Sequence, residues 1–69
     1  MDAQHLVSMV NDIAAFFASE TDKDAAAGQV ASHVQRFWEP RMRKALREYA
    51  STGGTGLSDL ARQAVKRLQ

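Results

Sequence analysis

The spacing of apolar residues is the feature that most restricts what this chain can fold into. Apolar side chains recur every three or four residues along almost the whole sequence, which is the spacing of one face of an α-helix. No segment alternates apolar and polar residues with the period of two that a half-buried β-strand requires. We therefore expect an all-α fold: residues 1–69 form a small single domain of three to four short helices. The apolar pattern places them over residues 6–17, 27–38, 41–49 and 60–68.

Capping residues mark the expected ends of these helices. Asp2, Asp24 and Ser58 are predicted N-caps of the first, second and last helix, because their side chains can accept hydrogen bonds from free amides of a first turn. Pro40 is predicted to end the second helix, since the residue before a proline avoids the α region. It is also well placed to begin the third, where its missing N–H costs nothing. One glycine of the pair 53–54 is expected to take the left-handed conformation after the third helix.

Length and the lack of cysteine limit both stability and chemistry. The chain has 69 residues and no Cys, which excludes disulfides, thiolate catalysis, iron–sulfur ligation and thiolate zinc sites. A domain this short buries only about 60% of the surface that its unfolded chain exposes. Without disulfides, the chain must be an unusually ideal small fold or be stabilised by a partner.

Two patterns favour a partner. Apolar residues of the first helix span roughly 180° of its circumference, more than the roughly 100° that a surface helix needs; the alternative is that the remaining helices wrap it. The net charge of +1 also hides a separation. Residues 1–39 carry six acids and two bases, a net charge of −4, whereas residues 40–69 carry seven bases and two acids, a net charge of +5. Such asymmetry can be neutralised within the domain or across an interface.

No set of residues in the sequence is typical of catalysis or metal binding. His5 and His33 lie in different predicted helices with no carboxylate at a ligand spacing, and His33 is expected at a boundary or an interface. The start of a calcium loop at 22–24 lacks the later ligands, and the glycines at 53–56 lack the Lys-Ser/Thr of a phosphate loop. We therefore predict no catalytic, cofactor-binding or metal-binding residue.

The stretch 36–47 holds the only Trp, the only Pro and five of the nine bases. Arg43 and Arg47 are like charges four residues apart, which destabilises an isolated helix by about 0.2–0.5 kcal/mol unless an anionic partner intervenes. We expect Phe37 to be a core residue, and the arginines at 41, 43 and 47 to contact another macromolecule. The predicted partner-binding residues are Phe37, Trp38, Pro40, Arg41, Met42, Arg43 and Arg47.

Three stretches carry a resemblance to a known family. They are LVSMVNDIAAFF at 6–17, HVQRFWEPRMR at 33–43, and GGTGL at 53–57. The sequence resembles the small delta subunit of the soluble, NAD-dependent, molybdenum-containing formate dehydrogenases, and the F-W-x-P-R-M-R core is the specific part of the match. The resemblance covers nearly the whole chain, apart from the linker at 19–24 and the last few residues.

This resemblance implies a non-catalytic accessory subunit of a cytoplasmic enzyme complex. In such complexes the large subunit oxidises formate at a bis-molybdopterin guanine dinucleotide centre, and iron–sulfur clusters pass electrons to a flavin (FMN) subunit that reduces NAD⁺. The family has no catalytic or cofactor-ligand motif to carry onto this chain. The implied partner is the large molybdenum-containing subunit and, through it, the flavin and iron–sulfur subunits. The implied role is in assembly or stability.

Two alternatives remain open at the level of the sequence. The net charge of +5 in residues 40–69 and the short turn at Pro40 are compatible with a small helix-turn-helix protein that binds nucleic acid, with an affinity that falls steeply with salt. A homodimer that buries its excess apolar surface against itself is the other. The sequence shows no signal peptide or membrane-spanning segment, so we expect a cytoplasmic protein with no membrane contact.

Overall fold

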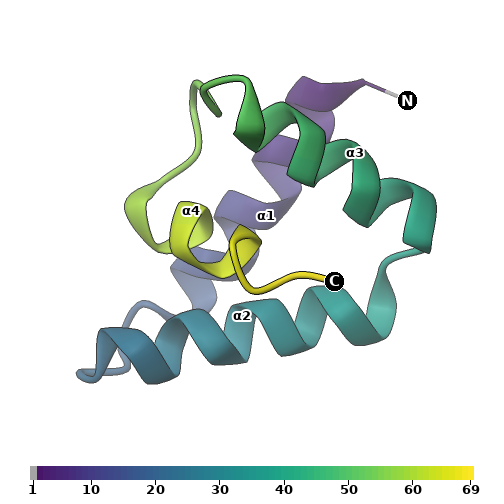
Figure 1. The fold of residues 1–69 in the computed structure, drawn as a ribbon. Helices are drawn as coiled ribbons and strands as arrows, with labels where there is room; N and C mark the ends of the chain where they lie inside the picture. Colours follow the sequence, from purple (N-terminus) through teal and green to yellow (C-terminus); the bar gives the residue numbers. More distant parts are fainter. Residues whose placement is uncertain (1) are drawn as a thin grey trace.

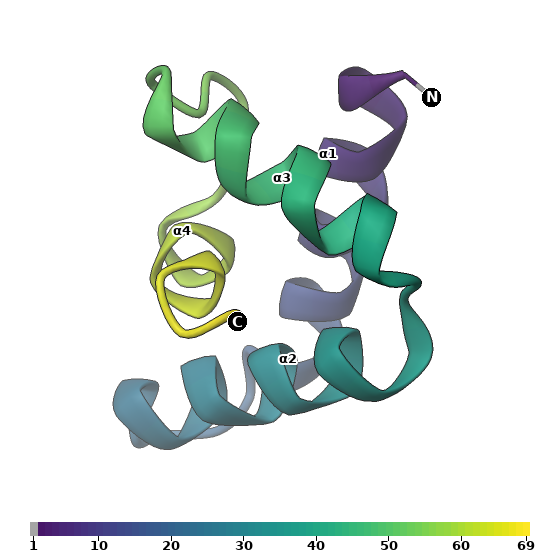
Figure 2. The ribbon, with the colours of Figure 1, turned by 45° about the vertical axis from the view of Figure 1, so that its right-hand side comes forward.

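The computed structural model describes residues 2–69, and four helices account for most of them. They are α1 (Ala3–Phe17), α2 (Lys23–Phe37), α3 (Pro40–Ser51) and α4 (Asp59–Val65). The all-α prediction is confirmed, and no strand occurs between residues 2 and 69. α4 is the shortest helix and packs against the other three; Figures 1 and 2 show it enclosed between α2 and α3, with α1 behind. The structure is therefore one small helical domain with a central C-terminal helix.

Most of the predicted helix ends are confirmed. The Asp2 carboxylate accepts a hydrogen bond from the Gln4 amide at 3.0 Å, and the Ser58 hydroxyl accepts one from the Ala61 amide at 3.1 Å. Pro40 is the first residue of α3, as expected from its fixed φ and missing N–H.

The predicted N-cap of α2 is wrong. The helix begins at Lys23 and its N-cap is Asp22, whose carboxylate accepts hydrogen bonds from the amides of Asp24 at 3.0 Å and Ala25 at 3.3 Å. Asp24 therefore lies inside the first turn. The apolar pattern could not reveal this turn, because residues 22–25 are all exposed and carry no core-facing residue.

The core is built mainly from small aliphatic side chains. α1 contacts all three other helices, so the alternative in which the remaining helices wrap its wide apolar face is confirmed. Phe16 is the exception on α1, with 78% of its surface exposed. The buried residues that form the core cluster are Leu6, Val7, Val10, Ala14, Val30, Ala31, Val34, Trp38, Leu46, Leu57, Ala61, Ala64, Val65 and Leu68.

The connection between α3 and α4 is held by backbone geometry and by one arginine. Gly53 and Gly54 have φ of +118° and +63°, so Gly54 takes the left-handed conformation predicted for this pair. The Arg62 guanidinium donates to the carbonyl oxygens of Gly53 at 2.9 Å and Gly54 at 3.0 Å. A Cβ at Gly54 would lie 2.8 Å from Arg62 Nη1, the end of a flexible side chain, so the positive φ is the main reason for glycine at this position.

Asn11 joins α1 to the segment that leads into α4. Its Nδ2 donates to the Gly56 carbonyl at 2.8 Å, and its Oδ1 accepts from the Ser58 amide at 3.0 Å. The two bonds connect residues 45 and 47 positions apart and set where α4 begins relative to α1.

Within residues 2–69, no helix combines the length and the apolar character needed to cross a membrane.

Candidate functional site

The predicted partner-binding residues lie at the corner between α2 and α3 and along α3. The structure separates them by burial. Trp38 is buried, and Met42 and Arg43 are half-buried. The exposed members are Phe37, Pro40, Arg41 and Arg47. Contact with a partner stays a prediction, and the exposed members are the ones whose side chains are available for it.

Trp38 and Arg43 build the corner from within the chain. Trp38 is the C-cap of α2, its side chain is only 6% exposed, and its amide donates to the Val34 carbonyl at 2.9 Å. Arg43 Nη1 donates to the Trp38 carbonyl at 2.5 Å and lies 3.4 Å from the Gln35 carbonyl. A guanidinium at the C-terminal end of α2 is favoured by the helix dipole. An internal contact therefore holds Arg43, the residue whose repulsion by Arg47 suggested an anionic partner.

The expectation that Phe37 is a core residue is wrong, since 66% of its surface is exposed. Phe37 and Trp38 are adjacent, but the last residue of α2 is Phe37 and Trp38 is its C-cap. Trp38 leaves the helix with an extended backbone, at φ −89° and ψ 144°, and its side chain turns inward. Phe37, still helical, points outward.

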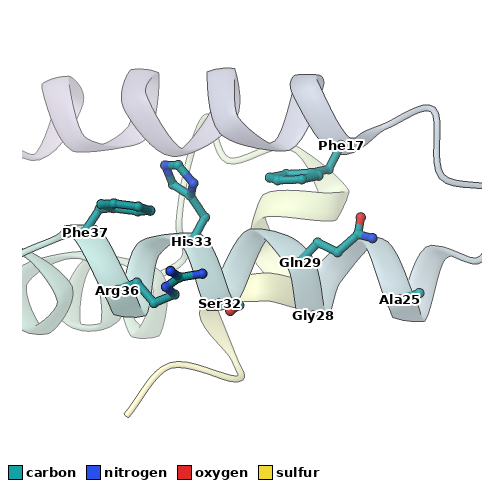
Figure 3. Close-up of a pocket in the computed structure, with 8 residues that line it drawn as sticks. All are labelled: Phe17, Ala25, Gly28, Gln29, Ser32, His33, Arg36 and Phe37. Atoms are coloured by element: carbon teal, nitrogen blue, oxygen red, sulfur yellow. The ribbon is translucent and has the colours of Figure 1, made fainter.

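Phe37 belongs to a row of rings that runs across α1 and α2, which we call the aromatic strip: Phe16, Phe17, His33 and Phe37. The ring centroids of Phe16 and Phe17 are 5.1 Å apart, those of Phe17 and His33 are 6.4 Å apart, and those of His33 and Phe37 are 4.8 Å apart. Figure 3 shows Phe17 extending from α1 toward α2, with His33 and Phe37 standing on α2. His33 is half-buried, so its predicted boundary position is confirmed.

The strip borders an open hollow of about 460 Å³. Small residues on α2, Ala25, Gly28 and Ser32, leave room along one side. The Arg36 guanidinium carbon lies 5.6 Å from the centroid of the Phe37 ring, so the rim of the hollow carries a positive charge over an aromatic face. The residues that line the hollow are Phe17, Ala25, Gly28, Gln29, Ser32, His33, Arg36 and Phe37 (Figure 3).

Reasoning from the sequence missed Phe16 as a surface residue. Adjacent positions of a helix can both be buried, as Leu6 and Val7 are, so the order of Phe16 and Phe17 does not tell which ring is exposed. The structure leaves Phe17 half-buried and Phe16 exposed. The contact between the rings of α1 and α2 could not be predicted from the sequence, because it depends on how the two helices cross.

The arrangement is suited to binding another protein. Exposed aromatic rings beside an arginine are the residue types enriched at the centres of protein interfaces. Among residues 2–69, no group of three or more His, Cys, Asp or Glu side chains lies close enough together to hold a metal ion. The aromatic strip is therefore the candidate functional site, and its chemistry is that of a docking surface.

Comparison with known proteins identifies the family of the chain. Residues 5–65 match the family model described as the NADH-dependent formate dehydrogenase delta subunit, FdsD. Neither the curated proteins nor the solved structures yielded a match. The family match extends over far more than half of the chain and confirms the resemblance carried by the F-W-x-P-R-M-R stretch. The chain therefore belongs to the delta subunit family of NADH-dependent formate dehydrogenase.

Proposed function

We propose that this chain is a non-catalytic accessory subunit of a cytoplasmic formate dehydrogenase complex and supports its assembly or stability by packing on the large molybdenum-containing subunit. Membership of the delta subunit family supports a place in such a complex. The observation that carries the packing role is the exposure of Phe16 at 78% and Phe37 at 66% in a domain that otherwise covers its large apolar side chains within residues 2–69.

The aromatic strip is the proposed contact with the large subunit. Full burial of a phenylalanine side chain contributes about 1.5–3 kcal/mol, so Phe16 and Phe37 together supply a substantial driving force for association. Pro40 and Arg41 are exposed just beyond Phe37 and extend this surface around the corner between α2 and α3. Arg36 lies over Phe37 and would meet a carboxylate or a carbonyl group at the rim of the interface.

The redox groups of the complex are assigned to other subunits in this proposal. Bis-molybdopterin guanine dinucleotide and the oxidation of formate belong to the large subunit, and iron–sulfur clusters and FMN carry electrons on to NAD⁺. A chain without cysteine has no thiolate to offer a cluster. The role of the delta chain in this proposal is structural, since it packs on and covers a surface of the large subunit.

Copurification from the native host tests this proposal. A tagged copy should recover the molybdenum-containing subunit, and the double variant Phe16→Ser/Phe37→Ser should recover at least about tenfold less, because each serine removes an apolar anchor. Gln63→Ser, at an exposed position of α4, is the matched control and should behave like the unchanged chain. Circular dichroism of each purified chain shows whether the helices are retained.

Two results would count against it. Failure of the unchanged chain to recover any molybdoenzyme subunit would overturn the proposed function. Full recovery by a folded Phe16→Ser/Phe37→Ser variant would show that the chain joins the complex through another surface.

A further inference from the structure

A second surface, on α3 and α4, differs from the aromatic strip in chemistry and in composition. Here an open hollow of about 450 Å³ lies between the C-terminal half of α3 and α4. It shares no lining residue with the hollow beside the aromatic strip. We call it the basic groove, and it is lined by Arg47, Ala50, Ser51, Arg62, Val65 and Lys66.

Three cations from two helices meet at this groove. The Arg62 guanidinium is held in place by its hydrogen bonds to the carbonyl oxygens of Gly53 and Gly54, so one positive charge is positioned before any ligand arrives. Arg47 and Lys66 are exposed. The ion pair found among residues 2–69 joins Asp24 to Arg67, which leaves the cations of the groove without a carboxylate partner in the described part of the chain.

The floor of the groove is apolar. Val65 is buried and Ala50 is half-buried, and both line the hollow between the charged side chains. A ligand that fits must therefore place negative groups near Arg47, Arg62 and Lys66 and a small apolar group between them. A polypeptide with Asp or Glu residues beside an alanine-sized side chain has this combination.

We propose that the basic groove binds an acidic segment of a protein partner. This inference rests on the proposed function, so the segment belongs to another subunit of the formate dehydrogenase complex. The net charge of +5 over residues 40–69 supplies the charge complementarity. A partner bound there and at the aromatic strip would hold this domain from two sides.

Nucleic acid fits the groove less well. Proteins that bind duplexes strongly neutralise about six to ten phosphates along a track, whereas three cations here converge on a single hollow with an apolar floor. Arg43, which would extend such a track along α3, donates instead to carbonyl oxygens at the end of α2.

Zero-length crosslinking of the purified complex tests the proposal directly. A carbodiimide activates a carboxylate, and an amine in contact with it then forms an amide bond. Lys66 Nζ should link to an Asp or Glu of another subunit, and the link should weaken as KCl is raised. Lys44, exposed on α3 outside the groove, is the internal control and should link far less. A complex that is recovered intact but gives no Lys66 link would overturn this inference while leaving the proposed function in place.

Binding of probes to the isolated full chain tests this inference independently of whether the complex assembles. The probes are a synthetic peptide of alternating Glu and Ala, its Gln and Ala analogue, and a DNA duplex. We expect the Glu peptide to bind best, Arg47→Glu and Lys66→Glu each to weaken it about fivefold, and Lys44→Glu to change it little. Tighter binding of the DNA duplex, or equal binding of the Gln analogue, would overturn the proposal.

Discussion

Phe37 and Trp38 are adjacent in the sequence, yet their surroundings are opposite. The Trp38 side chain is 6% exposed and lies in the core, whereas Phe37 is 66% exposed and belongs to the aromatic strip. The difference arises because α2 ends between them: Phe37 keeps the helical direction, and the extended backbone of Trp38 turns its ring inward. One residue therefore stabilises the fold, and the other is available to a partner.

Alanine at each position should reveal this division. Trp38→Ala should lower the free energy of unfolding by about 3–5 kcal/mol, because it removes a large buried side chain from a small core. Phe37→Ala is the neighbouring control and should change it by less than about 1 kcal/mol. Trp38 is the only tryptophan, so the Trp38→Ala variant cannot be followed by tryptophan fluorescence. Urea unfolding followed by circular dichroism measures both variants. Equal costs at the two positions would contradict the assigned roles.

At the scale of the element, the start of α2 shows how a helix can begin before its apolar pattern does. Asp22 caps the helix by accepting two amide hydrogen bonds, and the exposed residues that follow complete a first turn. Asp24 lies in that turn and pairs with Arg67 beyond the end of α4. Asp22 and Asp24 thus have different roles: Asp22 caps the backbone of α2, and Asp24 forms an ion pair with Arg67.

Replacement of each aspartate by alanine distinguishes the two roles. Asp22→Ala should cost about 1 kcal/mol, as expected for the loss of an N-cap side chain. Asp24→Ala should cost about 0.5 kcal/mol or less at high salt, because an exposed ion pair is weak and is screened. Thermal unfolding at low and high NaCl measures both values. A larger, salt-independent loss for Asp24→Ala would instead support Asp24 as the cap.

At the scale of the whole molecule, the position of α4 decides how the core closes. This helix has only seven residues, but it packs against α1, α2 and α3. Two sets of hydrogen bonds hold the segment that leads into α4. Asn11 bonds to the backbone of Gly56 and Ser58, and Arg62 donates to the carbonyl oxygens of the glycine pair 53–54. Ala61, Ala64 and Val65 of α4 are buried in the core, and the polar contacts fix the position of the segment that leads into the helix.

Asn11→Ala should therefore destabilise the domain by about 1–2 kcal/mol, through the loss of two hydrogen bonds to backbone groups far along the chain. Asp12→Ala changes the exposed neighbour on α1 and should stay within about 0.5 kcal/mol of the unchanged chain. Hydrogen exchange should show faster exchange in α4 for Asn11→Ala than for Asp12→Ala. Unchanged protection of α4 would show that its packing alone holds it.

The sequence by itself determined the local structure. The spacing of apolar residues predicted an all-α fold, and Asp2, Pro40 and Ser58 predicted three helix starts that the structure confirms. These features are readable because a helix is built from hydrogen bonds between residues four apart, and a cap acts over two or three residues. The stretch at 37–43 also pointed to the family that the model match over residues 5–65 confirms.

Only the tertiary structure decided which surfaces exist. Phe16 and Phe17 meet His33 and Phe37 because α1 and α2 pack together, and Arg47, Arg62 and Lys66 line one groove because α3 and α4 pack together. Neither meeting follows from the order of residues along one helix. The crossing of two helices depends on the shape of the whole core, which many residues determine jointly. Local chemistry thus specified the helices of this delta subunit, and their packing specified the faces that it offers to a partner.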